Sequence, residues 1–308
     1  MISTDARLFG RLVTAMVTPF DEELKIDFKA VASIVEHLIA TGTTAIVVNG
    51  TTGESPTLDD HEKEELLKAV IAVNNKRIKI IMGTGSNVTS KSIKATESAA
   101  ALGADGALVV APYYNKPSQA GLLAHFGVIA DASSLPLIVY NIPGRTGINI
   151  AAETMIALSH SHKTIHALKD STGNVEQASD IAAAARPDFN IYSGDDNLTL
   201  PFLSVGASGV ISVASHVLGR EIMAMQTAHF DGKPDQARAI HYQCMAMFKG
   251  LFTAPNPTCV KYALAKMGLC QSYLRLPLIP LDSAQKADLD EVLKNYSLEK
   301  REKELQAG

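Results

Sequence analysis

The sequence has no run of apolar residues close to the roughly 20 that cross a lipid bilayer, although 46% of its 308 residues are hydrophobic. It also has no block of lysine and arginine, because 28 basic residues are balanced by 32 acidic ones and the net charge is −4. The first absence excludes a membrane-spanning protein. The second removes the basic surface that binds nucleic acid. We therefore expect a soluble protein with a large core and a small-molecule partner.

Cysteine is scarce, with Cys244, Cys259 and Cys270 the only three in the chain. Their spacing matches neither a CxxC zinc site nor a disulfide framework, and an odd number is typical of reduced, buried thiols. The first residues, MISTDARLFGRL, lack the apolar stretch of a secretory signal peptide. These absences favour a reducing compartment, and we expect a cytoplasmic protein.

Eight short apolar runs are present along the chain, at 12–20, 44–50, 78–85, 106–114, 135–143, 164–170, 189–196 and 209–215. Each is nearly continuous in apolar residues, as strands covered on both faces are. Polar residues gather at their carboxyl ends. The runs therefore predict eight buried, parallel strands.

The segments between these runs have helical periodicity. In FKAVASIVEHLIATG the apolar residues share one stripe, at Val31, Ile34, Val35, Leu38 and Ile39. Gly42 follows as a stop, and Asp59 and Thr89 stand where side-chain oxygens cap helix starts. Alternation of strand and helix predicts an α/β fold, a closed (β/α)₈ TIM barrel rather than a doubly wound sheet.

The barrel accounts for residues 1–230, with a closing helix at 218–230. Residues 231–308 are expected to form a C-terminal α-helical domain, with helices around 234–252, 257–267 and 282–306. The charged end, SLEKREKELQAG, is interpreted as the solvated last helix.

In a barrel the active site lies at the carboxyl ends of the strands, and Lys169 ends the run TIHALK. A strand buried on both faces would carry Val or Ile there. Desolvation favours a neutral amine, which attacks a carbonyl and forms a Schiff base. An ion pair with Asp170, or an amine reaching the barrel rim, explains the position equally well. Position alone leaves both hypotheses open.

Three loops after strands add polar groups. Residues 50–55, GTTGES, offer glycine turns, hydroxyls and backbone N–H groups that suit a carboxylate, although a plain turn with a helix cap fits too. In 140–147, YNIPGRTG, Tyr140 supplies a phenol near the axis and Arg145 a guanidinium that grips carboxylates. Tyr113 and Tyr114 are adjacent aromatics, which serve a site, a subunit interface or both.

Two groups give only weak metal signals. His160, His162 and His166 fall at the helix-to-strand end of the barrel, where residues stabilise the fold. Asp195 and Asp196 are expected to cap the helix that DDNLTLPFL begins. We predict no metal site.

Six motifs taken together resemble the dihydrodipicolinate synthase family. They are GTTGES (50–55), APYYNKP (111–117), YNIPGRTG (140–147), LKDSTG (168–173), YSGDD (192–196) and GVISVASH (209–216). The likeness runs over roughly residues 10–290. It implies a (β/α)₈ barrel with C-terminal helices, and a class I aldolase that needs no metal or organic cofactor.

The resemblance implies that Lys169 forms an imine with pyruvate, and that the derived enamine attacks L-aspartate 4-semialdehyde to give 4-hydroxy-tetrahydrodipicolinate, in diaminopimelate and lysine biosynthesis. The implied catalytic residues are Lys169, Tyr140, Thr51 and Tyr114, the last donated across the tight dimer of a homotetramer. The implied binding residues are Thr52 for the pyruvate carboxylate, Arg145 for the semialdehyde carboxylate, and Gly194 and Ile211, whose backbone lines the imine pocket.

Arg145 separates this interpretation from its nearest alternative, another pyruvate aldolase of the superfamily. The related N-acetylneuraminate lyases share the lysine and the tyrosine but lack this arginine, and usually carry serine where Thr51 stands. A non-catalytic barrel would be favoured only if Lys169, Tyr140 or Thr51 were lost, and all three are present.

The resemblance also implies where lysine-inhibited relatives bind their effector, at positions matching Ser55, Pro56, Asp60, Lys63, Asn87, Lys91 and Tyr113. Asp60 and Lys63 replace histidines, and Lys91 replaces the glutamate that neutralises the effector's ammonium. Like charges about 4 Å apart at an effective dielectric near 20 repel by about 4 kcal/mol. We therefore expect an enzyme insensitive to L-lysine.

Overall fold

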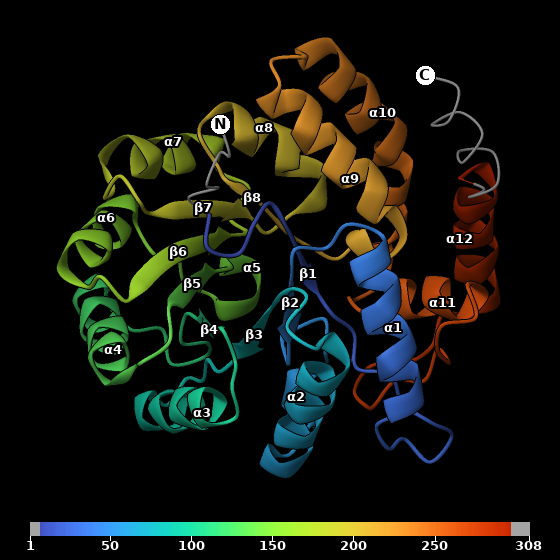
Figure 1. The fold of residues 1–308 in the computed structure, drawn as a ribbon, viewed down its shortest axis with the longest axis horizontal. Helices are drawn as coiled ribbons and strands as arrows, with labels where there is room; N and C mark the ends of the chain where they lie inside the picture. The colour runs from blue at the N-terminus through green and yellow to red at the C-terminus, as the bar shows by residue number, and fades with distance from the viewer. Residues whose placement is uncertain (1–6, 297–308) are drawn as a thin grey trace.

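The computed structural model describes residues 7–296 and shows a barrel ringed by helices (Figure 1). Its strands are β1 Leu12–Ala15, β2 Ala45–Val48, β3 Lys79–Gly83, β4 Gly106–Val110, β5 Leu137–Asn141, β6 Ile165–Asp170, β7 Asn190–Ser193 and β8 Gly209–Ser212. They pair in parallel in chain order, and β8 closes the ring by pairing with β1. The predicted (β/α)₈ barrel is confirmed.

The strands lie inside the predicted runs but are shorter. The run 12–20 contributes only the four residues of β1, and the run 106–114 only the five of β4. In each case the apolar sequence continues after the backbone has left the sheet. The carboxyl-terminal parts of these two runs therefore form loops at the end of the barrel where active sites of this fold are built.

Helices connect the strands and cover the outside of the barrel (Figure 1). The connecting helices are α1 Phe28–Ala40, α2 Asp60–Asn74, α3 Thr89–Ala101, α4 Gln119–Ala132, α5 Pro143–Thr146, α6 Ala152–Ser161, α7 Val175–Ala184 and α8 Thr199–Ser204. The 3-10 turns η1 Ser55–Thr57 and η2 Asp196–Leu198 follow β2 and β7. After β8 come α9 Ser215–Phe230, α10 Pro234–Gly250, α11 Thr258–Lys266 and α12 Ser283–Asn295. The predicted extension of the last helix to 306 lies outside the described residues.

The helix starts show which sequence signals the fold uses. Asp59 caps α2 as predicted, because its side chain accepts from the backbone N–H of Glu62 and Glu62 bonds back to Asp59. The prediction for Thr89 was wrong. Thr89 is the first residue of α3, and its hydroxyl bonds Nδ1 of His125 at 2.9 Å. A side-chain partner from the neighbouring helix has replaced the local cap.

Side-chain alternation along the strands separates two apolar layers. An inner cluster fills the barrel and includes Ile138, Tyr140, Ala167 and Ile211. The outer layer, which includes Leu168, packs between the strands and the helices. Lys169 follows two residues after the inward Ala167, so the strand geometry directs it toward the barrel axis.

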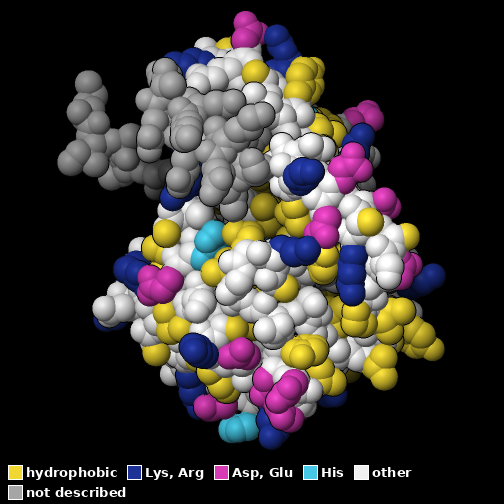
Figure 2. All heavy atoms as spheres, turned by 90° about the vertical axis from the view of Figure 1, so that its right-hand side faces the viewer, with side chains coloured by type: hydrophobic (Ala, Val, Ile, Leu, Met, Phe, Trp, Pro, Cys, Tyr) yellow, Lys and Arg dark blue, Asp and Glu magenta, His cyan; other side chains and the backbone are white. Residues whose placement is uncertain are grey.

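Helices α10 to α12 gather at one side of the barrel, beside α9 and α1 (Figure 1). On the face shown in Figure 2, basic and acidic side chains are interspersed, and neither sign forms a continuous patch on the described surface. Within residues 7–296 no helix is both long and apolar enough to cross a membrane.

Candidate active site

Lys169 is a buried amine near the mouth of the barrel. In β6 it lies in register with Tyr140 of β5 and Tyr192 of β7, and 5% of its surface is exposed. Its Nζ stands 4.2 Å from the centroid of the Tyr140 ring. Among the described residues no carboxylate lies within ion-pair distance of this amine. The Asp170 carboxylate instead accepts the Thr172 N–H at 2.8 Å.

The space beside Lys169 depends on Gly194, in the loop after β7. A Cβ at this position would lie 3.1 Å from Cε of Lys169 and 1.9 Å from Oγ of Ser171. A side chain at this position would therefore require Ser171 to move and would crowd the Lys169 side chain, whereas glycine leaves both in place. Ile211 of β8 is fully buried in the inner cluster. The structure therefore places Gly194 next to Lys169 and Ile211 on the inner barrel wall.

The turn GTTGES follows β2 and is tightly wound. The N–H of Gly53 bonds the carbonyl of Gly50 at 3.1 Å, and the N–H of Glu54 bonds the carbonyl of Thr51 at 3.0 Å. Glu54 takes a φ of +53°, in the left-handed region. Thr52 is buried whereas Thr51 is half-buried. Two threonines and their amides are thus held by backbone bonds rather than by a flexible loop.

The carboxyl end of β1 supports this turn from one side. Thr18 donates its hydroxyl hydrogen to the carbonyl of Gly53 at 2.7 Å. A Cβ on Gly53 would come within 3.2 Å of both Thr18 Oγ1 and the carbonyl of Met16. The glycine therefore allows the close approach of turn and strand.

The C-terminal helices hold the same turn from the other side, which the sequence analysis missed. Lys261 of α11 is fully buried and forms an ion pair with Glu54, which is 2% exposed. Lys261 also donates to the carbonyl of Tyr273 at 2.8 Å. Burial lowers the pKa of Lys261, and Glu54 opposes this shift. A lysine amid the apolar residues of TCVKYALA was the available signal.

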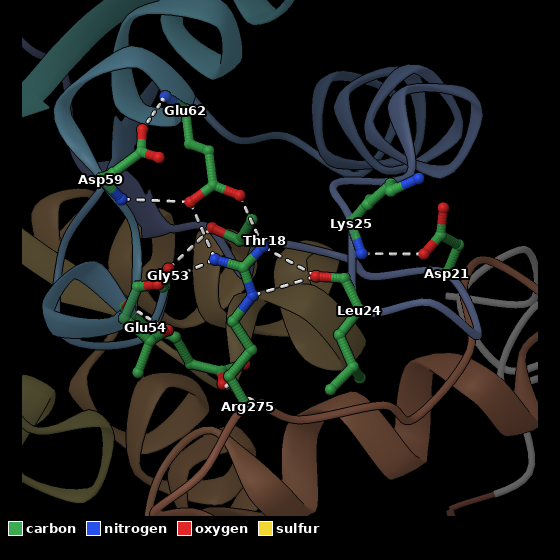
Figure 3. A network of polar contacts seen from close by, with 10 residues as sticks. Thr18, Asp21, Leu24, Lys25, Gly53, Glu54, Asp59, Glu62 and Arg275 are labelled. Carbon is green, nitrogen blue, oxygen red and sulfur yellow. Dashed lines mark hydrogen bonds and ion pairs between the residues drawn. The ribbon is translucent and has the colours of Figure 1, made fainter.

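Arg275 completes this support in the segment before α12 (Figure 3). Its backbone N–H bonds Glu54 Oε2 at 3.1 Å. Its guanidinium binds Glu62 with both terminal nitrogens, at 2.8 and 2.5 Å, and one of them also donates to the carbonyl of Leu24 at 2.7 Å. The hydrogen bond to Glu62 is the main cause that lowers the pKa of this carboxyl. The turn, α2 and the C-terminal segment are thereby linked.

Asn256, between α10 and α11, reaches the turn itself. Its Nδ2 donates to Oγ1 of Thr52 at 3.0 Å, and both side chains are buried. The partners are 204 residues apart in the chain. Asn256 could not be identified from the sequence, because nothing near it in the chain carries a catalytic pattern.

Arg145 occupies α5, a single helical turn directly after β5. Its side chain is exposed, and within residues 7–296 no acidic side chain forms an ion pair with it. Thr146 anchors the turn by donating to the carbonyl of Ile142 at 3.0 Å. The arrangement presents a free guanidinium close in sequence to the buried Tyr140.

Tyr114 is the predicted site residue that differs most from the others. It is 90% exposed and has a φ of +72°, whereas Tyr140 and Lys169 are buried. A bulky residue in the left-handed region is held there at some cost. Within a single chain, Tyr114 therefore projects into solvent and does not join the buried group.

The prediction that Asp195 and Asp196 cap the following helix was wrong. Asp195 precedes η2 without any side-chain cap bond. Asp196 is fully buried and accepts from the Ser212 hydroxyl and from the backbone N–H groups of Val213 and Ala214, at 3.1 and 2.9 Å. It therefore ties the loop after β7 to the residues just before α9, a long-range contact that local sequence does not reveal.

Asp195 is an acidic neighbour of the buried amine. Burial raises the pKa of Asp195, and the charge of Lys169 opposes this shift. Asp195 thus contributes a carboxyl to the surroundings of Lys169 that the sequence analysis had assigned to a structural role.

Metal ligands do not cluster in the described part of the chain, where no three His, Cys, Asp or Glu residues are arranged to hold an ion. His160 bonds the carbonyl of Ala184 at 2.9 Å, as expected of a stabilising residue. Cys244 and Cys259 are buried free thiols, whereas Cys270 is only partly buried.

Comparison with known proteins adds an independent line of evidence. The model of the dihydrodipicolinate synthetase family matches residues 8–296. The 4-hydroxy-tetrahydrodipicolinate synthase 2 of Halalkalibacterium halodurans is 49% identical over 281 residues, which are 91% of this chain and 96% of that protein. The 4-hydroxy-tetrahydrodipicolinate synthase of a Listeria monocytogenes strain is 47% identical, over 94% of this chain and 99% of its own.

Solved structures agree with the sequence matches. A dihydrodipicolinate synthase from Bacillus anthracis has a TM-score of 0.91 and 46% identity, covering 93% of this chain and 98% of its own. The enzyme from Cyanidioschyzon merolae, solved with lysine bound, has a TM-score of 0.93 and 45% identity, covering 95% and 99%. With the barrel, the buried lysine and the threonine turn in place, the chain belongs to the dihydrodipicolinate synthetase family.

Proposed function

We propose that the mouth of the barrel condenses pyruvate with L-aspartate 4-semialdehyde through a Schiff base on Lys169. Family membership carries the reaction, which belongs to the diaminopimelate and lysine pathway. The observation that supports Lys169 is its burial against the ring of Tyr140, with no carboxylate of the described residues within ion-pair distance. A lysine amine in this position is the kind of group that adds to a keto carbon and forms an imine.

In the proposed sequence, the Lys169 amine adds to the keto carbon of pyruvate and water leaves, which forms the imine. The imine withdraws electrons, so the neighbouring methyl group can lose a proton. This loss converts the imine into an enamine. The enamine carbon then attacks the aldehyde of the second substrate. The amino group of the second substrate then replaces the Lys169 nitrogen at the imine carbon, which closes the ring, frees the lysine and gives 4-hydroxy-tetrahydrodipicolinate.

We assign the proton transfers to Tyr140, Thr51 and Tyr114. The position of Tyr140 supports this, because its ring contacts the Lys169 amine. Thr51 lies in the turn after β2 and is only half-buried. Hydroxyl groups pass protons without leaving a full charge in a site shielded from water.

We assign the two substrate carboxylates to different loops. Thr52 and the amides of the 50–55 turn suit the carboxylate of pyruvate, because the turn directs small polar groups from a rigid backbone. Arg145 suits the carboxylate of the semialdehyde, since its guanidinium is exposed and has no acidic partner in the described chain. Gly194 and Ile211 are assigned to the lining of the imine pocket.

The proposed assembly is a homotetramer in which Tyr114 acts in the site of the neighbouring subunit of a tight dimer. Its exposed fraction of 90% and its strained φ support a role outside its own chain. Mixing the inactive variants Tyr114→Phe and Lys169→Ala tests this. One site of a hybrid dimer then carries both wild-type residues, so partial activity returns. No recovery despite proven subunit exchange would place Tyr114 in its own site.

Three further parts of the proposal concern the whole chain. We propose a boundary at residue 230 between the catalytic barrel and the C-terminal helical domain, and a cytoplasmic location.

We also propose insensitivity to L-lysine. In support, Lys91 is exposed where an acidic partner for the effector is required, and Lys63 pairs with Asp60 at 3.3 Å. Saturable inhibition at about 10 mM L-lysine and subsaturating pyruvate would contradict this.

The central experiment is borohydride reduction in the presence of pyruvate, followed by mass spectrometry of peptides. Reduction converts the imine to a stable amine, so the peptide that contains Lys169 gains the mass of the reduced pyruvyl group. A label on another lysine, or none, would refute the assignment.

A further inference from the structure

The C-terminal helical segment meets the threonine turn at two points two residues apart. Asn256 bonds Thr52, and Lys261 of α11 pairs with Glu54. Both contacts are buried, and each joins parts of the chain more than 200 residues apart. The second contact joins Lys261 to the side chain of Glu54 at the end of the turn, and the first acts on a side chain that we assign to substrate binding.

In the contact between Asn256 and Thr52, Asn256 is the hydrogen-bond donor and the Thr52 oxygen is the acceptor. The Asn256 Nδ2 group is a donor only, so it occupies a lone pair of the Thr52 oxygen. The hydroxyl hydrogen of Thr52 is then left to be donated elsewhere. Within residues 7–296 the structure offers that hydrogen no acceptor, and a bound carboxylate is the natural one.

The rest of the Asn256 side chain does not stabilise the fold through hydrogen bonds. Its Oδ1 is buried and has no partner in the described chain. The bond to Thr52 is thus the one hydrogen bond of this side chain among the described residues. Because the amide donates only to the Thr52 hydroxyl, orienting that hydroxyl explains the buried Asn256 better than a contribution to the stability of the core does.

We propose that Asn256 is a positioning residue for the first substrate: it orients the Thr52 hydroxyl so that its hydrogen points to the carboxylate of the 2-keto acid. This rests on the proposed assignment of Thr52. Through Asn256 the C-terminal helices act on keto-acid binding, although they lie outside the barrel. The expected signature is a selective loss of affinity for pyruvate, with the chemical steps at Lys169 intact.

The test compares Asn256→Ala and Asn256→Asp with a matched control, Asn190→Ala. Asn190 lies at the start of β7, donates to the carbonyl of Asp188 and accepts from Ser208, so its removal costs hydrogen bonds away from the turn. We expect Asn256→Ala to raise KM for pyruvate about 5- to 20-fold, with kcat and KM for the semialdehyde within about 3-fold. Asn256→Asp keeps the size of the residue but adds a charge that accepts the Thr52 hydrogen and repels the substrate, so its KM rises further. The control leaves KM unchanged.

A double-mutant cycle separates positioning from direct binding. If Asn256 acts through Thr52, adding Asn256→Ala to Thr52→Val raises KM for pyruvate by less than about 2-fold over Thr52→Val alone. Multiplicative effects, or KM values for both Asn256 variants within about 2-fold of wild type, overturn the inference. Failure of the wild-type protein to trap pyruvate on Lys169 would instead refute the proposed function, so the two failures are distinguishable.

Discussion

Lys169 and Lys261 are both buried, and their surroundings differ in one respect that matters. Each amine lies over an aromatic ring, 4.2 Å from the centroid of Tyr140 for Lys169 and 4.1 Å from that of Phe20 for Lys261. Lys261 also has a carboxylate partner, Glu54, and a carbonyl acceptor. For Lys169 the described chain supplies no ion-pair partner.

The difference separates a lysine held by an ion pair from the lysine to which we assign the reaction. A buried ammonium is costly unless it is paired and hydrogen-bonded. Lys261 meets this requirement and joins the 50–55 turn to the C-terminal helices. Lys169 has no carboxylate within ion-pair distance among the described residues, and its burial fits the imine-forming role that we propose for it. The same substitution at the two positions should therefore give opposite results.

The largest effect is expected for Lys169→Met. Turnover should fall at least roughly a thousandfold, because no other residue supplies the imine nitrogen. The free energy of unfolding should change by less than about 1 kcal/mol or rise, since no carboxylate of the described residues lies within ion-pair distance of the buried amine that the substitution removes. Steady-state rates and urea unfolding measure both. If Lys169→Met lost as much unfolding free energy as Lys261→Met, the proposed difference between the two lysines would be wrong.

Lys261→Met should behave in the opposite way, losing about 3–5 kcal/mol of unfolding free energy because Glu54 is left as a buried, unpaired charge. Methionine keeps the length of the side chain, so little packing is lost. The double variant with Glu54→Gln is the control and should recover most of the stability. If the double variant is no more stable than the single one, the pair is not the cause.

His216 sharpens the comparison as a buried base that avoids the cost by staying neutral. Its Nε2 accepts the Val17 N–H at 3.2 Å, so Nδ1 carries the hydrogen and donates to the carbonyl of Val213 at 2.8 Å. Burial lowers the pKa of His216 from 6.5 to about 4. The His216 imidazole is therefore neutral in the folded protein at neutral pH.

This pKa shift predicts acid destabilisation. Below pH 6.5 the unfolded chain binds a proton at His216 that the folded chain refuses until about pH 4. Its contribution is thus fully present above pH 6.5 and decreases by about 3 kcal/mol on acidification to pH 4. Urea unfolding of the wild type and of His216→Gln, measured between pH 4 and pH 6.5, isolates the contribution of His216 to the pH dependence of the unfolding free energy. Parallel profiles for the two proteins would show that His216 is not responsible.

The smallest effect is expected for Arg145→Ala, which removes an exposed cation rather than a buried one. A charge-assisted contact with the second substrate contributes roughly 1.5–3 kcal/mol, or about 10- to 200-fold in kcat/KM for the semialdehyde. Imine formation with pyruvate and the stability of the fold should remain near wild type. Loss of pyruvate trapping with unchanged use of the semialdehyde would reverse the assignment.

The fold was predictable because its signals are local. Apolar runs such as TAIVVNG and the stripe on α1 follow from the burial of strands on both faces and helices on one, and the closed barrel confirms them. Asp59 was predictable as a cap because both partners lie within one helical turn. Thr89 was not, because its partner His125 belongs to the next helix.

The residues of the candidate site show the same difference between local signals and contacts with distant residues. Lys169, Tyr140 and the 50–55 turn were identified from residue type and position at strand ends, and their roles stay predictions. Asp196 was misassigned because its partners lie 16 to 18 residues away on the next strand and loop. Asn256 was missed because it acts on a residue 204 positions away.

By itself the sequence determined the strands, the helices and which lysine ends a buried strand, because periodicity and residue type are properties of neighbouring residues. Only the tertiary structure decided which buried lysine is paired. Both lysines follow apolar residues in the chain, Ala167 and Leu168 before Lys169 and Cys259 and Val260 before Lys261. Glu54 nevertheless forms an ion pair with Lys261, whereas no carboxylate of the described residues lies within ion-pair distance of Lys169. Charge compensation in a protein interior depends on distance in space, and the closing of the barrel and the docking of α11 set that distance.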